Sequence, residues 1–262
     1  MELDLRNKVV VITGAARGIG AVIAQRFAAE GAKVIAFDLA FPDPADGVGV
    51  EEGQGEELPV EQVVCNVADP ESVQAAVDEV AGRHGTIDVL VNNAGINVEG
   101  AVADIEWARW KACMDVNVGG AFLMSQAVAP LMQAAGGGRI INAASFAAIV
   151  PSVASAAYSA SKSAVVQLTR VLASELGPWD ITVNAYAPGM VPTAMNGFAE
   201  MPTEAQDRLL DTLSLRRWET PDDVANLLIF LASDQASYIT GTLLDVSGGK
   251  LATQIPSRAY GR

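Results

Sequence analysis

The chain has 262 residues, half of them hydrophobic, and a formal net charge of −14. This length allows one large α/β domain with a sizeable core. The negative charge disfavours nucleic acid and anionic membrane surfaces as partners. No apolar run is long enough to span a bilayer, and the start MELDLRNK lacks the apolar core of a signal peptide. Cys65 and Cys113 have no disulfide or metal spacing. We therefore expect a cytoplasmic protein without a metal site.

Short apolar runs alternate with helical patterns along the chain. Because the runs are apolar throughout, they are typical of strands buried on both faces of a parallel sheet. Strands are predicted at 8–13, 33–38, 61–66, 88–93, 138–145, 181–188 and 242–248. Helices are predicted at 17–30, 70–83, 106–134, 154–177 and 221–233. This order predicts one α/β domain with a doubly wound parallel sheet of about seven strands and helices on both faces.

Three segments depart from this alternation. The connection after Asp38, LAFPDPADGVGVEEGQGEELPVEQ, is rich in Pro, Gly and acidic residues, so we expect an exposed acidic loop. The segment 190–215 is predicted to be a lid over the substrate, with a helix near 203–214. The basic tail 250–262 fits either a frayed end or an arm that reaches a neighbouring subunit.

The stretch TGAARGIG, residues 13–20, joins the first predicted strand to the first predicted helix. This is the context of a dinucleotide-binding turn, in which Gly14, Gly18 and Gly20 let a diphosphate approach the backbone at a helix N-terminus. The spacing G-x-x-x-G-x-G differs from the common G-x-G-x-x-G pattern. A tight turn without a ligand is the simpler alternative.

Asp38 ends the second predicted strand. A carboxylate there can accept hydrogen bonds from the adenosine ribose and would repel a 2′-phosphate, which favours NAD over NADP. Arg17 points the other way, since a guanidinium in the turn can hold a phosphate. The acidic loop after Asp38 adds negative charge, so NAD is the predicted cofactor.

Tyr158 and Lys162 are four residues apart in a predicted helix, so both side chains share one face. Ser145 ends the preceding strand, at the edge where open α/β sheets place reactive groups. Free tyrosine titrates near ~10, and a neighbouring cation lowers that pKa. Lys162 can therefore help Tyr158 act as an acid/base, while Ser145 hydrogen-bonds the substrate oxygen. A Tyr-x-x-x-Lys pair alone is also common as a plain helix contact.

Taken together, these motifs resemble the short-chain dehydrogenase/reductase family. The resemblance is carried by TGAARGIG (13–20), Asp38, NNAG (92–95), MDVNVGGAF (114–122), IINAASFAA (140–148), YSASK (158–162), VNAYAPGMVPTAM (183–195) and ITGTLLDVSGG (239–249). These segments occur in order over nearly the whole chain. The resemblance implies a Rossmann-type domain and hydride transfer between a nicotinamide cofactor and a secondary alcohol or ketone.

The resemblance also assigns residues to the site. The catalytic residues would be Ser145, Tyr158, Lys162 and Asn117, with Asn117 holding a water on the proton path. The cofactor would contact Gly14, Arg17, Gly18, Ile19, Gly20, Asp38, Asn66, Val67, Asn93, Ala94, Gly95, Tyr158, Lys162, Pro188, Gly189, Val191 and Thr193. The substrate would contact Asn97, Ser145, Phe146, Tyr158, Met190 and Met195. Asn66 replaces an aspartate that the family often has at this position, and an amide still hydrogen-bonds adenine.

The substrate itself stays open at this stage: a sugar, a polyol or a small cyclic or aryl alcohol all fit. Alternative functions are an NADP(H)-dependent ketoreductase and a non-catalytic cofactor-binding sensor or scaffold. The resemblance further implies a homotetramer joined through the helices at 106–134 and 154–177 and through the last helix and strand, although dimers also occur.

Overall fold

The structure, a computed structural model, describes residues 3–42, 58–192 and 201–260. Within these residues, seven parallel strands form one sheet in the order β3-β2-β1-β4-β5-β6-β7. The strands are β1 (Val9–Thr13), β2 (Lys33–Asp38), β3 (Val60–Val64), β4 (Val89–Asn92), β5 (Gly138–Ala143), β6 (Ile181–Pro188) and β7 (Leu243–Val246). The chain order reverses between β1 and β4, and this is the switch point at which open α/β sheets bind ligands.

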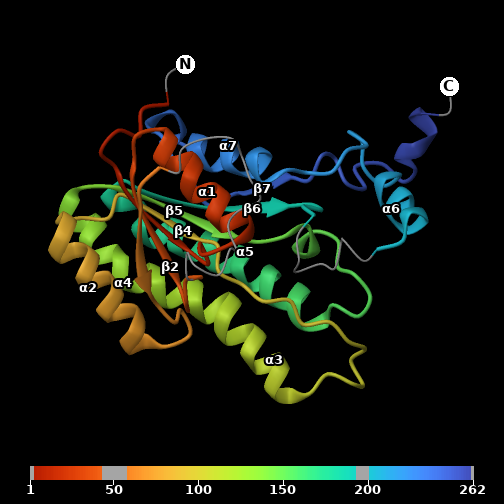
Figure 1. The fold of residues 1–262 in the computed structure, drawn as a ribbon, viewed down its shortest axis with the longest axis horizontal. Coiled ribbons are helices and arrows are strands. Elements are labelled where there is room, and N and C mark those ends of the chain that lie inside the picture. Colours follow the sequence, from red (N-terminus) through yellow and green to blue (C-terminus); the bar gives the residue numbers. More distant parts are fainter. Residues whose placement is uncertain (1–2, 43–57, 193–200, 261–262) are drawn as a thin grey trace.

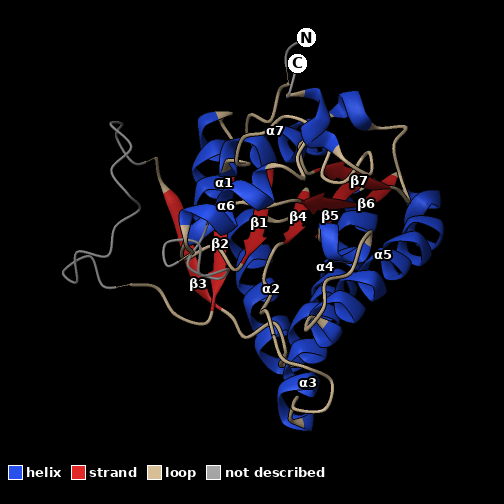
Figure 2. Ribbon diagram, turned by 90° about the vertical axis from the view of Figure 1, so that its right-hand side faces the viewer, coloured by secondary structure: helices blue, strands red, loops and turns tan. Residues whose placement is uncertain are grey.

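Helices cover both faces of the sheet (Figure 1; Figure 2). One face packs against α1 (Gly18–Ala29) and α7 (Pro221–Ala232) through a buried apolar cluster. The other face packs against α2 (Pro70–His84), α4 (Gly120–Ala135) and α5 (Ala156–Leu176) through a second cluster. Burial on both faces explains why the strand sequences are apolar throughout and do not alternate.

Local sequence signals set the helix ends. The Asp69 side chain accepts a hydrogen bond from the Glu71 amide and caps α2, and Gly85 ends the helix in a left-handed conformation. At α7, Thr220 and Asp223 form a reciprocal capping box around Pro221.

The fold class and the predicted strands are confirmed, with small shifts at their ends. The single helix predicted at 106–134 is wrong in one respect, because the chain there forms α3 (Trp107–Met114), a π-helical turn at Asp115–Gly119 and then α4. The helix predicted near 203–214 is shorter, α6 (Thr203–Leu210). Most of the acidic loop after β2 lies outside the described residues.

The described part of the tail packs on its own chain, beside α6 (Figure 1). The Leu251 amide donates to the Thr212 carbonyl at 2.9 Å, and the Tyr260 hydroxyl donates to the Ser214 carbonyl. The Arg216 guanidinium lies 5.4 Å from the centre of the Tyr260 ring. A frayed end is therefore wrong for residues 250–260.

Among the helices that the structure describes, none has the length and apolar character needed to cross a membrane.

Candidate active site

The glycine turn after β1 is packed tightly against the segment after β4. Gly14 has a φ of +65°, and a Cβ there would lie 2.8 Å from the Ala94 Cα. The Asn93 side-chain amide donates to the carbonyls of Thr13 and Gly14 at 3.0 and 3.1 Å. A Cβ on Gly20 would lie 2.7 Å from the same amide nitrogen. The turn therefore requires glycine at both positions.

Gly18 differs from these two glycines. It has a φ of +60°, and a Cβ there would meet no atom within 4 Å. Helix α1 begins here without a side-chain cap and without an acidic residue in its first turn. No side chain caps the first N–H groups of the helix, and a helix N-terminus of this kind can bind an anion. These features fit the diphosphate of a dinucleotide, held by the backbone from Gly14 to Gly20 with Arg17 and Ile19 beside it.

The Asp38 carboxylate lies at the edge of this turn. Its Oδ2 accepts from the Ala16 amide at 2.9 Å, and its Oδ1 accepts from the Leu39 amide at 2.8 Å. Arg17 is exposed and forms no ion pair with another described residue. The acid is therefore oriented by the turn, whereas the guanidinium is not.

The other predicted cofactor residues follow the carboxyl ends of the neighbouring strands. After β3, the exposed Asn66 accepts from the Ala68 amide at 3.1 Å, and the buried Val67 packs where a Cβ on Gly120 would be 2.8 Å away. Pro188 ends β6, and the next residue, Gly189, approaches Ser247 so closely that a Cβ would lie 2.8 Å from the Ser247 Cβ. Val191 is buried, and Thr193 lies outside the described residues.

Ser145, Tyr158 and Lys162 meet at the same edge of the sheet. The Lys162 ammonium donates to the Ala143 carbonyl at 2.8 Å and lies 5.6 Å from the centre of the Tyr158 ring. The Ser145 hydroxyl accepts from the Ala147 amide at 3.1 Å and also forms a hydrogen bond with the Tyr158 phenol. Ser145 and Tyr158 line one cleft, and a Cβ on Gly95 would lie 3.3 Å from the Lys162 Nζ.

Burial shifts the proton affinities of this group. It lowers the pKa of Lys162 to about 8, and it raises the pKa of the Tyr158 phenol, an effect that the hydrogen bond with Ser145 opposes. The net direction is opposite to the predicted lowering, because desolvation of the phenolate outweighs the hydrogen bond with Ser145. Burial by the protein alone therefore favours the protonated phenol of Tyr158 over its phenolate.

Asn117 occupies the π-helical turn and connects the segments around Lys162. Its Oδ1 accepts from the Ile96 amide at 2.8 Å, and its Nδ2 donates to the Ile96 carbonyl and the Ser161 hydroxyl at 3.0 and 2.9 Å. The Cys113 thiol packs in the same network, and burial raises its pKa. A Cβ on Gly95 would lie 3.2 Å from the Asn117 Oδ1. The turn thus places Asn117 beside Gly95, which also lies beside the Lys162 ammonium.

The cleft beside Tyr158 has a volume of about 260 Å³. Of the residues predicted to contact substrate, Asn97, Ser145, Phe146 and Tyr158 line it. Met190 is not among its lining residues, and its carbonyl instead accepts from the Glu219 amide at 3.3 Å. Met195 lies outside the described residues.

Two charged residues near the cleft were missed by the sequence reasoning. Lys250 lines the cleft, although its sequence position assigned it to the tail. Glu219 is 6% exposed, its Oε2 accepts from the Gly189 amide at 2.6 Å, and its Oε1 has no partner among the described residues. Burial raises the pKa of Glu219 to about 7. The motif RRWETPDDVA indicated only a helix start, so no local signal identified this carboxylate.

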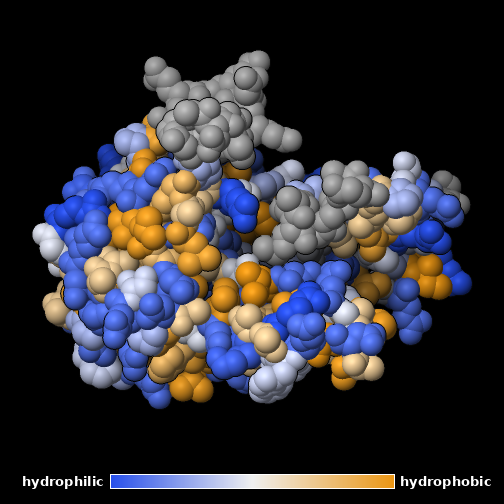
Figure 3. Space-filling view, turned by 60° about the horizontal axis from the view of Figure 1, so that its bottom comes forward, coloured by the Kyte–Doolittle hydropathy of each residue, from blue (hydrophilic) through white to orange (hydrophobic). Residues whose placement is uncertain are grey.

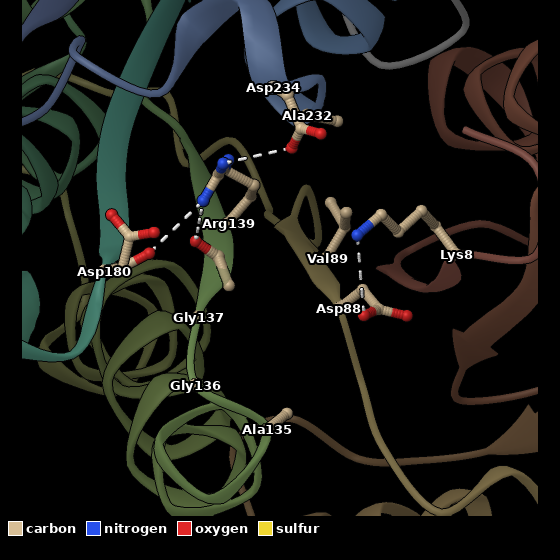
Figure 4. A pocket seen from close by; sticks show the side chains of 11 residues that line it. Lys8, Asp88, Val89, Ala135, Gly136, Gly137, Arg139, Asp180, Ala232 and Asp234 are labelled. Carbon is tan, nitrogen blue, oxygen red and sulfur yellow. Dashed lines mark hydrogen bonds and ion pairs between the residues drawn. The ribbon is translucent and has the colours of Figure 1, made fainter. Parts of the chain in front are cut away.

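A second cavity, of about 200 Å³, lies at the opposite end of the strands (Figure 4). Lys8, Asp88, Arg139, Asp180 and Asp234 line it, and none of the predicted site residues does. It is not the candidate active site. In the described ranges, no group of three or more metal-ligating side chains is present.

Known proteins with similar sequences define the family to which the chain belongs. A family model described as enoyl-(acyl carrier protein) reductase matches residues 14–250. The chain is 38% identical to the 3-oxoacyl-[acyl-carrier-protein] reductase FabG of Thermotoga maritima, covering 94% of this chain and 99% of the relative. It is 40% identical to a D-threitol dehydrogenase of Mycolicibacterium smegmatis, covering 95% and 94%.

A solved structure from Beutenbergia cavernae is similar with a TM-score of 0.85 and 37% identity, covering 97% of this chain and all of that one. It was assigned as a candidate NAD(P)-dependent gluconate 5-dehydrogenase and holds NADP at low occupancy. The chain thus belongs to the short-chain dehydrogenase/reductase family of oxidoreductases. Members of this family use a nicotinamide cofactor.

Proposed function

We propose that this protein is an NAD(H)-dependent dehydrogenase/reductase that interconverts a secondary alcohol and its ketone. The observation that carries the proposal is the cleft in which Ser145 and Tyr158 lie next to Lys162, at the carboxyl ends of the strands that also carry the glycine turn. This arrangement supports a catalytic role over a non-catalytic sensor or scaffold, because each group needed for proton transfer is present.

In the oxidative direction, the Ser145 hydroxyl donates a hydrogen bond to the substrate oxygen and orients it. Tyr158 accepts the hydroxyl proton as the carbon–hydrogen bond breaks. Lys162 stabilises the phenolate form, and the Asn117 network holds the helix segments that position Lys162. When bound, the cofactor supplies the hydride acceptor, and the positive charge of its oxidised nicotinamide favours the phenolate. In reduction, the proton returns from Tyr158 to the oxygen.

The preference for NAD rests on Asp38. Its carboxylate is held at the turn by the Ala16 amide and would repel a 2′-phosphate there. The exposed Arg17 and the NADP in the similar structure favour NADP as a second candidate. We rank NAD first because hydrogen bonds hold the Asp38 carboxylate at the turn, whereas the exposed Arg17 side chain forms no ion pair with another described residue.

The proposed substrate is a small alcohol with further polar groups, such as a sugar, a polyol or a cyclic alcohol. The Asn97 Oδ1 is buried without a partner among the described residues, while its Nδ2 donates to Glu99 at 2.8 Å. This oxygen can therefore accept a hydrogen bond from a substrate hydroxyl.

A homotetramer in the cytoplasm is also proposed. The molecular face in Figure 3 carries apolar patches, and Phe122 on α4 and Val171 on α5 are 44% and 52% exposed.

The experiment that tests the function is a screen of secondary alcohols with NAD and NADP, followed by absorbance of the reduced cofactor. Wild-type protein is expected to reduce NAD with at least one polyol, sugar or cyclic alcohol. Turnover with NADP equal to or above that with NAD would reject the proposed cofactor. Turnover that survives Tyr158→Phe would reject the proposed proton path. Light scattering during size-exclusion chromatography tests the tetramer.

A further inference from the structure

The turn after β7 fixes the position of Lys250. Gly248 and Gly249 both have positive φ, at +69° and +74°, and a Cβ on Gly249 would lie 2.8 Å from the Ser214 Cβ. The Lys250 amide then donates to the Ser247 hydroxyl at 3.2 Å. This turn places Lys250 in the lining of the cleft that contains Ser145 and Tyr158.

The Lys250 ammonium lies close to the proposed reaction site. Its Nζ is 5.1 Å from the centre of the Phe146 ring, and Phe146 directly follows Ser145. The side chain is half-buried, and this burial lowers its pKa. In the described residues, no carboxylate oxygen lies within 4.0 Å of this nitrogen. The charge is thus partly desolvated and has no ion-pair partner there, which costs free energy unless a ligand supplies one.

Two acidic residues near the cleft do not supply an ion-pair partner for Lys250. Glu99 is exposed, and its Oε1 accepts from the Asn97 side chain at 2.8 Å. Glu219 attracts Lys250 electrostatically, but neither of its carboxylate oxygens lies within 4.0 Å of the Lys250 nitrogen. Among the described residues that line the cleft, Lys250 is the only cationic one.

We propose that Lys250 binds a carboxylate group of the substrate, so that the cleft prefers hydroxy acids or keto acids to neutral alcohols. The proposal rests on the function proposed above and narrows its substrate class. The whole chain carries a net charge of −14 and disfavours anions at long range, so a local cation is needed to hold one in the cleft. One charge-assisted hydrogen bond is typically worth a tenfold or greater change in affinity.

The test compares two isosteric probes, cyclohexanecarboxylate and cyclohexanecarboxamide, by calorimetric titration into NADH-loaded protein. Wild-type protein is expected to bind the carboxylate at least about tenfold more tightly than the amide. Lys250→Met is expected to abolish this preference, and Lys250→Arg to retain it. Lys33→Met is the matched control, because it removes the same charge from an exposed position at the start of β2. Its preference should equal that of the wild type.

Three outcomes would overturn the proposal: equal binding of both probes by wild-type protein, no measurable binding of either, or a preference that survives Lys250→Met. A loss of NADH affinity in Lys250→Met as large as its loss of carboxylate affinity would also overturn it, because Lys250 would then be a cofactor contact. A separate measurement, the turnover of Tyr158→Phe, tests the proposed function. If Tyr158→Phe retains both turnover and the carboxylate preference, the proton path fails while the role of Lys250 stands.

Discussion

The charged side chains at the two ends of the parallel sheet differ in whether they form ion pairs. At the amino ends of the strands, charged side chains have partners: Lys8 lies 4.0 Å from Asp88, and Arg139 lies 3.5 Å from Asp234 (Figure 4). The Asp88 carboxylate also accepts from the Val9 amide at 2.7 Å. These groups are paired, and most of them reach solvent, so their shared role is to hold the strand ends.

At the carboxyl ends, Lys162 and Glu219 are buried and form no ion pair within 4.0 Å with another described residue. Lys162 is 4% exposed and donates to a backbone carbonyl, and Glu219 is 6% exposed with one oxygen unpartnered among the described residues. Burial shifts the pKa values of both groups toward neutrality. Such groups reduce stability, and they are typical of catalytic and binding sites. The comparison thus predicts that substitutions at the carboxyl ends alter activity or pH dependence, and that those at the amino ends alter neither.

The largest effect is expected for Tyr158→Phe. The substitution removes the group proposed to take the alcohol proton, so turnover should fall by roughly 10²–10⁴-fold, the usual range for one acid/base group. Cofactor reduction is measured by absorbance and cofactor affinity by fluorescence titration, which should change little. Tyr238→Phe is the matched control, because Tyr238 is fully exposed. Wild-type turnover in Tyr158→Phe would contradict the assignment of activity to the carboxyl ends of the strands.

Glu219→Gln should change how stability depends on pH. The folded pKa of Glu219 is raised from 4.5 to about 7, so the folded state holds a proton there that the unfolded state has already lost. Its contribution to stability is therefore present below pH ~4.5 and is lost as pH rises through about 7, by roughly 3 kcal/mol. Relative to wild type, the glutamine variant should gain about this much unfolding free energy between pH 5 and pH 7.5.

Urea denaturation at a series of pH values measures this difference. Glu175→Gln is the control, since Glu175 is an exposed carboxylate on α5. Parallel curves for wild type and Glu219→Gln would show that the buried carboxylate does not titrate in this window. The amino and carboxyl ends would then differ less than burial implies.

Much of the fold and part of the site can be predicted from local patterns in the sequence. The apolar runs predicted the strands because burial on both faces requires them, and Tyr158 and Lys162 were predicted to share a face from their spacing alone. The glycine turn was predictable because Gly14 and Gly20 leave no room for a side chain. Each of these signals lies within one element or one turn.

Lys250 and Glu219 could not be placed in this way. Lys250 reaches the cleft because two glycines with positive φ turn the chain after β7. Glu219 becomes buried because its carboxylate contacts Gly189, thirty positions earlier in the chain. The π-helical turn that orients Asn117 was likewise absent from the predicted continuous helix. These features depend on long-range packing, for which the local pattern carries no information.

A smaller effect is expected for Asp38→Ser. The substitution removes the charge that repels a 2′-phosphate while leaving a hydroxyl that can hydrogen-bond the turn. The ratio of kcat/KM for NAD to that for NADP should fall by roughly 10–100-fold, or about 1.4–2.7 kcal/mol. Initial rates with both cofactors measure it, and Asp78→Ser on the exposed part of α2 is the control. An unchanged ratio would assign cofactor choice to other residues.

The smallest effect is expected at the amino ends, for Asp234→Asn. The Asp234 side chain is 81% exposed and lies 3.5 Å from the Arg139 guanidinium, so the pair should contribute less than about 1 kcal/mol. Arg139 keeps its hydrogen bonds to the carbonyls of Gly138 and Asp180, at 2.9 and 3.3 Å. Unfolding free energy should therefore fall by at most this amount, and kcat/KM should stay within twofold of wild type. A larger loss of activity would mean that residues at the amino ends of the strands affect catalysis in the cleft. Whether a charged group is paired would then no longer distinguish structural from functional residues in this sheet.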